Sequence, residues 1–194
     1  MTKKEIWKER IGNLFRSKLF WLLVILFIIV FLFRNLVMEQ VQVGGQSMES
    51  TLQDGDILLV EKRTYEKNNP ERYDIVVLNT EGNSMWGQQY VKRIIGLPGE
   101  TIQIKKGKVW IDGKELKEPF DFEEIEDGGL ATEKIELEEN EYFVLGDNRN
   151  NSKDSRHLEI GTVNLKQIKG KVWMRVYPFQ HIGAVNTRKE KGNE

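Results

Sequence analysis

A run of fifteen apolar residues, Leu19 to Phe33 (LFWLLVILFIIVFLF), constrains the fold of this 194-residue chain more than any other feature. A transmembrane helix needs about 20 mostly apolar residues. The flanking Lys18 and Arg34 can lengthen the run, because their charged ends reach toward the two membrane interfaces. The sequence therefore predicts one transmembrane helix over residues 19–38.

Two other interpretations of the apolar run are weaker. A cleaved signal peptide has small residues at its cleavage site, whereas residues 34–45 (RNLVMEQVQVGG) contain no Ala-x-Ala pattern. A helix buried in so small a protein would be apolar on one side only. Residues 1–18 carry six basic and two acidic side chains. The positive-inside rule therefore predicts that they form a cytoplasmic basic segment and that the chain after residue 38 is extracytoplasmic.

The composition excludes several functional classes. The chain has 29 basic and 30 acidic residues and a formal net charge of −1, which argues against a nucleic-acid partner bound through bulk charge. It has no cysteine, which excludes disulfides, a cysteine nucleophile and thiolate metal sites. With only two histidines, no metal site is expected.

Short β-like runs between Gly, Pro and Asp turns follow the apolar run and predict a mostly β domain, a barrel or sandwich, over residues 39–186. Residues 115–141 carry twelve acidic side chains and two lysines, which predicts a solvated insertion at about 112–141. The charged residues 187–194 predict a disordered tail. The expected strands are Ile57–Val60, Asp74–Leu78, Tyr90–Ile95, Thr101–Ile104, Lys108–Ile111, Glu141–Leu145 and Lys171–Tyr177, with a hairpin turn at Asp112-Gly113.

Three polar clusters interrupt the strand pattern: Gly44–Leu52, Lys92–Glu100 and Gly146–Arg156. Each could be an ordinary surface turn or loop. In the first cluster, two glycines that permit positive φ angles precede Ser47. The third cluster lacks the spacing of an EF-hand calcium loop.

Lys92 shares a strand face with the apolar Tyr90 and Ile94. It is either an edge lysine that opposes aggregation or a buried lysine with a lowered pKa. If Ser47 is a nucleophile, its base would be His157 in a triad or Lys92 in a dyad, and the dyad is favoured. A base active near neutral pH needs a pKa of about 7–8, against about 10.4 for a free lysine. A contacting carboxylate would raise the pKa of Lys92, so none is expected.

The order of these motifs resembles the type I signal peptidases, membrane-bound serine endopeptidases that remove signal peptides. An apolar anchor is followed by SMxxTL from Ser47, KRxxGxPG from Lys92 and GDNxxxSxDSR from Gly146. The resemblance covers the whole chain, and the single anchor and small size are most similar to the compact Gram-positive forms. It implies a β catalytic core with a β insertion, no cofactor, and a single-pass protein of the cell membrane.

The resemblance also implies a role for each matched residue. Ser47 would be the nucleophile, and its backbone N–H would donate to the oxyanion. Lys92 would be the general base, and Ser152 would orient its amine through a hydrogen bond. Two ion pairs would hold the third cluster against the strand of Lys92. In these ion pairs Asp147 would bind Arg93 and Asp154 would bind Arg156. Asn148 is implied as a further supporting residue of the site.

The expected partners are signal peptides of exported pre-proteins, membrane lipid and, by proximity, the secretion translocon. The substrate would bind as an added β-strand, through its main chain, and shallow apolar pockets would select small side chains such as Ala-x-Ala. The expected substrate-binding residues are Gln42, Val43, Gly44, Gly45, Met48, Gln89 and Tyr90.

Two positions depart from the family pattern. Ser50 stands where proline is usual, which predicts an altered rigidity of the turn after Ser47, and Glu100 stands where Asp is more common. Neither change touches the dyad. The alternative function is that of an inactive or narrow-substrate paralogue that binds or processes one exported protein. A self-cleaving repressor with Ser–Lys chemistry is excluded by the apolar run.

Overall fold

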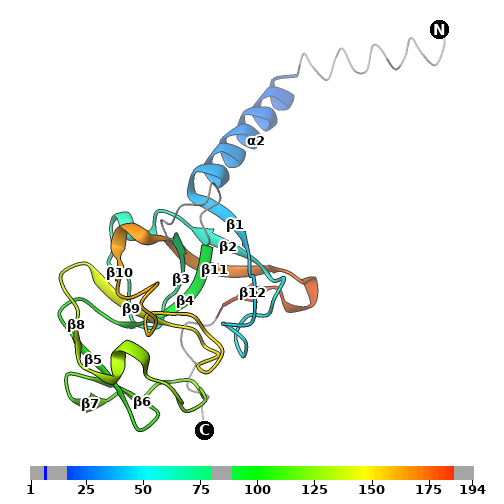
Figure 1. Ribbon diagram of the computed structural model, residues 1–194. Coiled ribbons are helices and arrows are strands. Elements are labelled where there is room, and N and C mark those ends of the chain that lie inside the picture. Colours follow the sequence, from blue (N-terminus) through cyan, green and yellow to red (C-terminus); the bar gives the residue numbers. More distant parts are fainter. Residues whose placement is uncertain (1–6, 8–16, 80–88, 186–194) are drawn as a thin grey trace, which may run out of the picture. The chain divides into compact units, whose positions relative to one another are not determined.

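The computed structural model of the chain describes residue 7, residues 17–79 and residues 89–185 (Figure 1). The chain divides into two compact units, residues 1–38 and residues 39–194. The predicted basic segment and C-terminal tail therefore lie almost entirely outside the described residues.

The first unit contains helix α2, Lys18–Val37, which covers the apolar run. Its 20 residues contain no glycine or proline that would interrupt a helix. In the described part of the chain, no helix combines the length and hydropathy needed to cross a membrane. The segment is thus helical as predicted, but a membrane-spanning helix is not supported.

The second unit is built from two β-sheets (Figure 1). The larger sheet has the order β1-β2-β11-β3-β4-β9-β10, with β12 paired to β11, and the smaller has the order β7-β6-β5-β8. The strands of the larger sheet are β1 (Met38–Gln42), β2 (Ile57–Glu61), β3 (Ile75–Asn79), β4 (Gln89–Gly96), β9 (Glu141–Leu145), β10 (Val163–Asn164), β11 (Ile168–Tyr177) and β12 (Gly183–Ala184). Those of the smaller sheet are β5 (Thr101–Lys105), β6 (Lys108–Ile111), β7 (Lys114–Glu115) and β8 (Ile135–Glu136). Short 3-10 helices lie at Thr64–Glu66, Gly129–Thr132, Leu165–Gln167 and Phe179–His181.

The apolar pattern of each strand accounts for its place in the sheets. Strand β3 is buried from Ile75 to Leu78, because it lies between β11 and β4 and both its faces are covered. Strand β2 alternates between buried and half-buried residues, as a strand with one covered face does. Asp112 and Gly113 both have positive φ angles and join β6 to β7 in the predicted two-residue hairpin turn. The prediction of a mostly β fold is confirmed.

The acidic segment differs from the wholly solvated insertion that the sequence predicts. Most of its carboxylates are exposed as expected. However, Ile125, Ala131 and Leu137 are buried and pack with residues of β5, β6 and β9 in one hydrophobic cluster. The net charge of the segment hides these widely spaced apolar anchors, so it forms part of the folded core.

Candidate active site

Ser47 and Lys92 meet in the structure, although 45 positions separate them in the chain. Ser47 lies in a turn after β1, and Lys92 lies within β4 with only 1% of its surface exposed. Lys92 Nζ is 2.6 Å from Ser47 Oγ and donates a second hydrogen bond of 3.1 Å to the carbonyl of Val91. This distance is short enough for direct proton transfer between the two side chains.

Burial lowers the pKa of Lys92 from its ordinary value of 10.5 to about 8, although the more distant Asp154 and Asp147 act in the opposite direction. Among the described residues, no carboxylate lies within ion-pair distance of Lys92 Nζ. A large neutral fraction of Lys92 at mildly alkaline pH follows from this environment.

The turn that carries Ser47 is held on both sides of the serine. Met48 and Leu52 are fully buried in one hydrophobic cluster, and the carbonyl of Met48 accepts hydrogen bonds from the amides of Thr51 and Leu52. Before the serine, Gly45 has a φ of 81° and donates its amide to Asp54. A residue with a side chain would be strained at Gly45, so one of the two glycines adopts the positive φ that the sequence permits.

The loop from Gly146 to Arg156 lies directly against the Ser47 turn. The Asn148 amide N–H donates to the Ser47 carbonyl at 3.1 Å, and its side-chain amide donates to the Gln46 carbonyl at 3.1 Å. Gly146 has no room for a Cβ atom, because the Ser47 carbonyl oxygen and the Ser152 hydroxyl occupy that space. The loop thus fixes the position of the serine backbone.

Two buried ion pairs hold this loop, and both join the residues that the resemblance implied. Asp147 accepts from Arg93 Nε at 2.7 Å and Arg93 Nη2 at 2.6 Å, and both side chains are fully buried. Asp154 accepts from Arg156 Nε at 2.8 Å and from Arg156 Nη2 at 2.9 Å. Because Arg93 follows Lys92 in β4, the first pair connects the loop to the strand that carries the amine.

One sequence expectation for this region is wrong in detail, and one disfavoured alternative is excluded. Ser152 Oγ is buried but has no hydrogen-bond partner among the described residues, so it does not orient Lys92. Its predicted place is taken by the carbonyl of Val91. His157 is 46% exposed, and its Nδ1 accepts from the amide of Asp154. The described contacts of Ser47 include Lys92 and not His157, which removes the triad.

The expected substrate-binding residues fall into two groups. Gln42, Gly44, Gly45 and Gln89 are exposed and Tyr90 is half-buried, whereas Val43 and Met48 are buried core residues. Met48 therefore does not line a surface pocket, contrary to the expectation. The amide and carbonyl of Val43 both bond to residues 55 and 56, so the main-chain groups of the alternate residues Gln42 and Gly44 point to the outer edge.

A layer of aromatic side chains from the acidic segment was missed by the sequence reasoning. The Arg93 guanidinium lies 4.3 Å from the Phe120 ring centre, and that of Arg149 lies 4.1 Å from the Phe122 ring centre. Arg149 also forms a bidentate ion pair with Glu118. The alternation of acidic and aromatic residues in EPFDFEE, residues 118–124, is a signal that could have indicated this cover over buried arginines.

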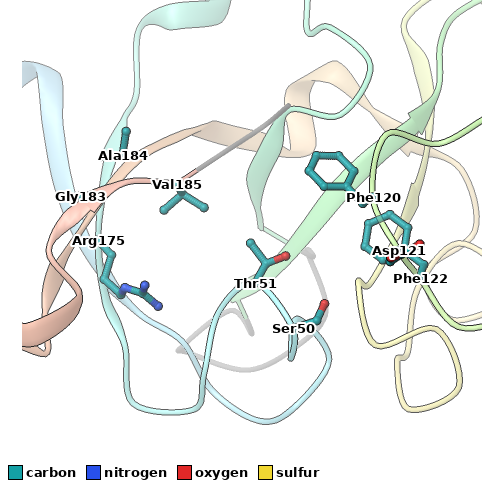
Figure 2. A pocket seen from close by; sticks show the side chains of 9 residues that line it. All are labelled: Ser50, Thr51, Phe120, Asp121, Phe122, Arg175, Gly183, Ala184 and Val185. Carbon is teal, nitrogen blue, oxygen red and sulfur yellow. The ribbon is translucent and has the colours of Figure 1, made fainter. Parts of the chain in front are cut away.

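A cavity of about 350 Å³ lies beside the Ser47 turn. Figure 2 shows Ser50 and Thr51 between the segment of Phe120 to Phe122 on one side and Arg175 and Val185 on the other. Thr51 donates to Asp147 Oδ2 at 2.5 Å. Thr51, one of the residues that line the cavity, is therefore hydrogen-bonded to the Gly146–Arg156 loop.

Comparison with known proteins identifies the family. The model of the family described as signal peptidase, peptidase S26, matches residues 16–177. Signal peptidase I P of Bacillus subtilis subsp. natto is 35% identical over 189 residues, which cover 94% of this chain and 98% of that protein. Signal peptidase I of Bacillus caldolyticus is 38% identical over 162 residues, which cover 78% of this chain and 83% of that protein.

Among solved structures, the crystal structure of a signal peptidase I from Enterococcus faecalis is 33% identical. The structural match covers 54% of this chain and 97% of the Enterococcus faecalis chain, and its TM-score is 0.41.

The chain belongs to the signal peptidase family, peptidase S26. Its activity is that of a signal peptidase I, a serine peptidase that removes signal peptides from exported pre-proteins. The resemblance stated from the three sequence motifs is confirmed.

Ser50 adopts a backbone conformation that proline cannot. Its φ is 84°, whereas the proline ring fixes φ near −65°. Replacing Ser50 with the proline usual in the family is therefore expected to destabilise this chain by more than about 1 kcal/mol. Ser50→Gly is the matched control, because glycine accepts positive φ, and it is expected to keep or raise the stability. Urea unfolding of the two variants measures this, and a stable Ser50→Pro variant would contradict the assigned conformation.

Proposed function

We propose that Ser47 and Lys92 are the catalytic dyad of this peptidase. The observation that carries the proposal is the 2.6 Å separation of Lys92 Nζ and Ser47 Oγ, with the lysine buried and its pKa lowered to about 8. A lysine whose pKa is lowered to about 8 has a usable neutral fraction near neutral pH and can act as a general base, whereas an exposed lysine is almost wholly protonated there.

The reaction proceeds through an acyl-enzyme. Neutral Lys92 takes the proton of Ser47 Oγ as this oxygen attacks the carbonyl carbon of the scissile peptide bond. The tetrahedral intermediate collapses, the C–N bond breaks, and Lys92 returns the proton to the leaving amine. Lys92 then takes a proton from water, which attacks the ester carbonyl. The ester bond breaks, Ser47 recovers its proton, and the signal peptide leaves with a free carboxylate.

The oxyanion that forms in both steps needs a hydrogen-bond donor. Among the described contacts, the Ser47 amide donates to no protein acceptor, so it can donate to the oxyanion. The Asn148 bond to the Ser47 carbonyl fixes the same peptide unit. A fixed donor stabilises the transition state because it needs no reorganisation during the reaction.

The residues before the scissile bond pair with the outer edge of β1. Gln42, at the end of the edge strand β1, and Gly44, two residues after it, are exposed just before Ser47. Main-chain pairing there would hold signal peptides of different sequence. Cleavage after small residues, of the Ala-x-Ala type, is proposed from the family resemblance.

Residues 19–38 are proposed as an uncleaved single-pass anchor on the strength of the fifteen-residue apolar run alone. In this arrangement residues 1–18 are cytoplasmic, the domain of residues 39–186 is extracytoplasmic beside the translocon, and membrane lipid surrounds the anchor. Sodium carbonate extraction of cell membranes is expected to leave the full chain in the pellet. Release of the chain into the supernatant would contradict the anchor.

Cleavage of a pre-protein with an Ala-x-Ala site tests the dyad, with products identified by mass spectrometry. The detergent-solubilised full chain is expected to cut once, after the second alanine, and Ser47→Ala is expected to abolish the cut. Ser50→Ala is the matched control in the same turn and should retain activity within about threefold. Cleavage that persists in Ser47→Ala would contradict the proposal. Binding without cleavage by the unmodified chain would favour the inactive or narrow-substrate alternative.

A further inference from the structure

Two adjacent residues of the polar loop hold the two ends of the Ser47 turn. At its start, the Asn148 amide donates to the carbonyl of Ser47. At its end, the hydroxyl of Thr51 donates to Asp147 Oδ2 at 2.5 Å. Between these points the turn contains Ser50 in a left-handed conformation. These two bonds add to the buried side chains and the Met48 carbonyl bonds that already hold the turn, and the second of them depends on a single hydroxyl.

The Thr51 hydroxyl is also connected to the strand of Lys92. Asp147 Oδ2, which accepts the Thr51 proton, accepts at 2.6 Å from Arg93 Nη2 as well. Arg93 Nη2 in turn lies 3.4 Å from Thr51 Oγ1. Arg93 is the residue after Lys92, and its Nη1 donates to the carbonyl of Tyr73. The end of the serine turn and the strand that carries the amine thus meet at one buried carboxylate.

We infer that Thr51 is a positioning residue, whose hydroxyl sets the distance between Ser47 Oγ and Lys92 Nζ. This inference rests on the proposed dyad. Thr51 touches neither the substrate nor the reacting atoms in this arrangement, and it acts through Asp147 and Arg93. Without the hydroxyl, Asp147 keeps its arginine partner, so the loop can stay folded while the end of the turn loses its direct bond to the loop.

Thr51→Val tests the inference, because valine keeps the branched shape and removes the hydroxyl. We expect kcat for pre-protein cleavage to fall about 10- to 100-fold, since a small misplacement of reacting groups costs this much. KM should change less than about threefold, because the β1 edge is untouched. Thr51→Ser retains the hydroxyl and is expected to recover kcat to within about threefold of the parent.

Thr162→Val is the matched control for the loss of a threonine hydroxyl. Thr162 Oγ1 also donates to a carboxylate, Glu141 Oε1 at 2.8 Å, at the β9–β10 end of the sheet. Its kcat should stay within about threefold of the parent, as expected for a contact that does not reach the turn. All assays are run well below the melting temperature of each variant, which thermal unfolding provides.

Three results would overturn the inference. They are an unchanged kcat in Thr51→Val, a failure of Thr51→Ser to restore kcat, and an equal loss in Thr162→Val. Failure of the proposed dyad is a separate outcome, because it appears as cleavage by Ser47→Ala whatever the Thr51 variants do.

Discussion

Lys92→Met is expected to reduce kcat/KM for pre-protein cleavage by at least about 10³-fold, because loss of a member of a nucleophile–base unit has effects of this size. Methionine has a similar length and packs in an apolar site, so the fold should be preserved. Single-turnover cleavage with excess enzyme measures the loss without interference from product release.

Lys169→Met is the matched lysine control. Lys169 is half-buried and forms an ion pair with Glu39 at 2.7 Å, but it is no part of the site. Its kcat/KM should remain within about threefold of the parent, as expected for a surface pair. A Lys92→Met variant with activity comparable to Lys169→Met would show that another group is the base.

The same Lys92→Met substitution is expected to stabilise the protein near neutral pH. Burial lowers the pKa of Lys92 from 10.5 to about 8, so between these values the unfolded chain holds the proton and the folded chain does not. The free energy of unfolding therefore rises as pH increases through this window, and the full penalty is present below it. Methionine removes a penalty of about 3 kcal/mol. Urea unfolding at pH 7 and pH 10.5 should show a gain at pH 7 that shrinks at pH 10.5.

Breaking the buried Arg93–Asp147 pair is the second change with a large expected effect. Asp147→Asn should lower the free energy of unfolding by about 3–5 kcal/mol, because the guanidinium is left buried without its counter-charge. Both side chains have no exposed surface, so solvent cannot compensate. Urea unfolding gives this value directly, and cleavage should be lost with it because the loop no longer holds the Ser47 turn.

The exposed Lys108–Glu115 pair provides the control for this prediction. Its side chains are 50% and 41% exposed, and Lys108→Met should leave the free energy of unfolding nearly unchanged. If Asp147→Asn destabilises the protein no more than Lys108→Met does, the buried pair is not a main support of the loop.

The sequence predicted the parts of the fold and site that depend on local pattern. Alternating or continuous apolar runs indicated the main strands, such as Glu141–Leu145 and Asp74–Leu78, the second of which runs from Ile75 to Asn79 in the structure. The order of the motifs also identified Ser47 and Lys92 as candidates for a catalytic dyad, without knowledge of the distance between them. The two-residue strands β8 and β10 were missed because they are too short to show a pattern.

The features that the sequence did not predict depend on side-chain packing between segments that are distant in the chain. Ser152 was expected to bond Lys92, but the lysine amine donates to the carbonyl of Val91 instead. Met48 was expected at a substrate pocket, but it is fully buried in the core. Phe120 lies over Arg93, and the alternating acidic and aromatic residues of its segment do not indicate which arginine it covers. The rotamer of each side chain and its hydrogen-bond partner depend on how the two sheets pack, which local sequence patterns do not specify.

The pH dependence of single-turnover cleavage tests the central claim, that a neutral Lys92 activates Ser47. With a pKa of about 8, the cleavage rate should rise tenfold per pH unit up to about pH 8. It should be about 100-fold lower at pH 6 than on the plateau above pH 9. The substrate should lack ionisable groups beside the scissile bond. A rate that stays constant between pH 6 and pH 9 would contradict the claim.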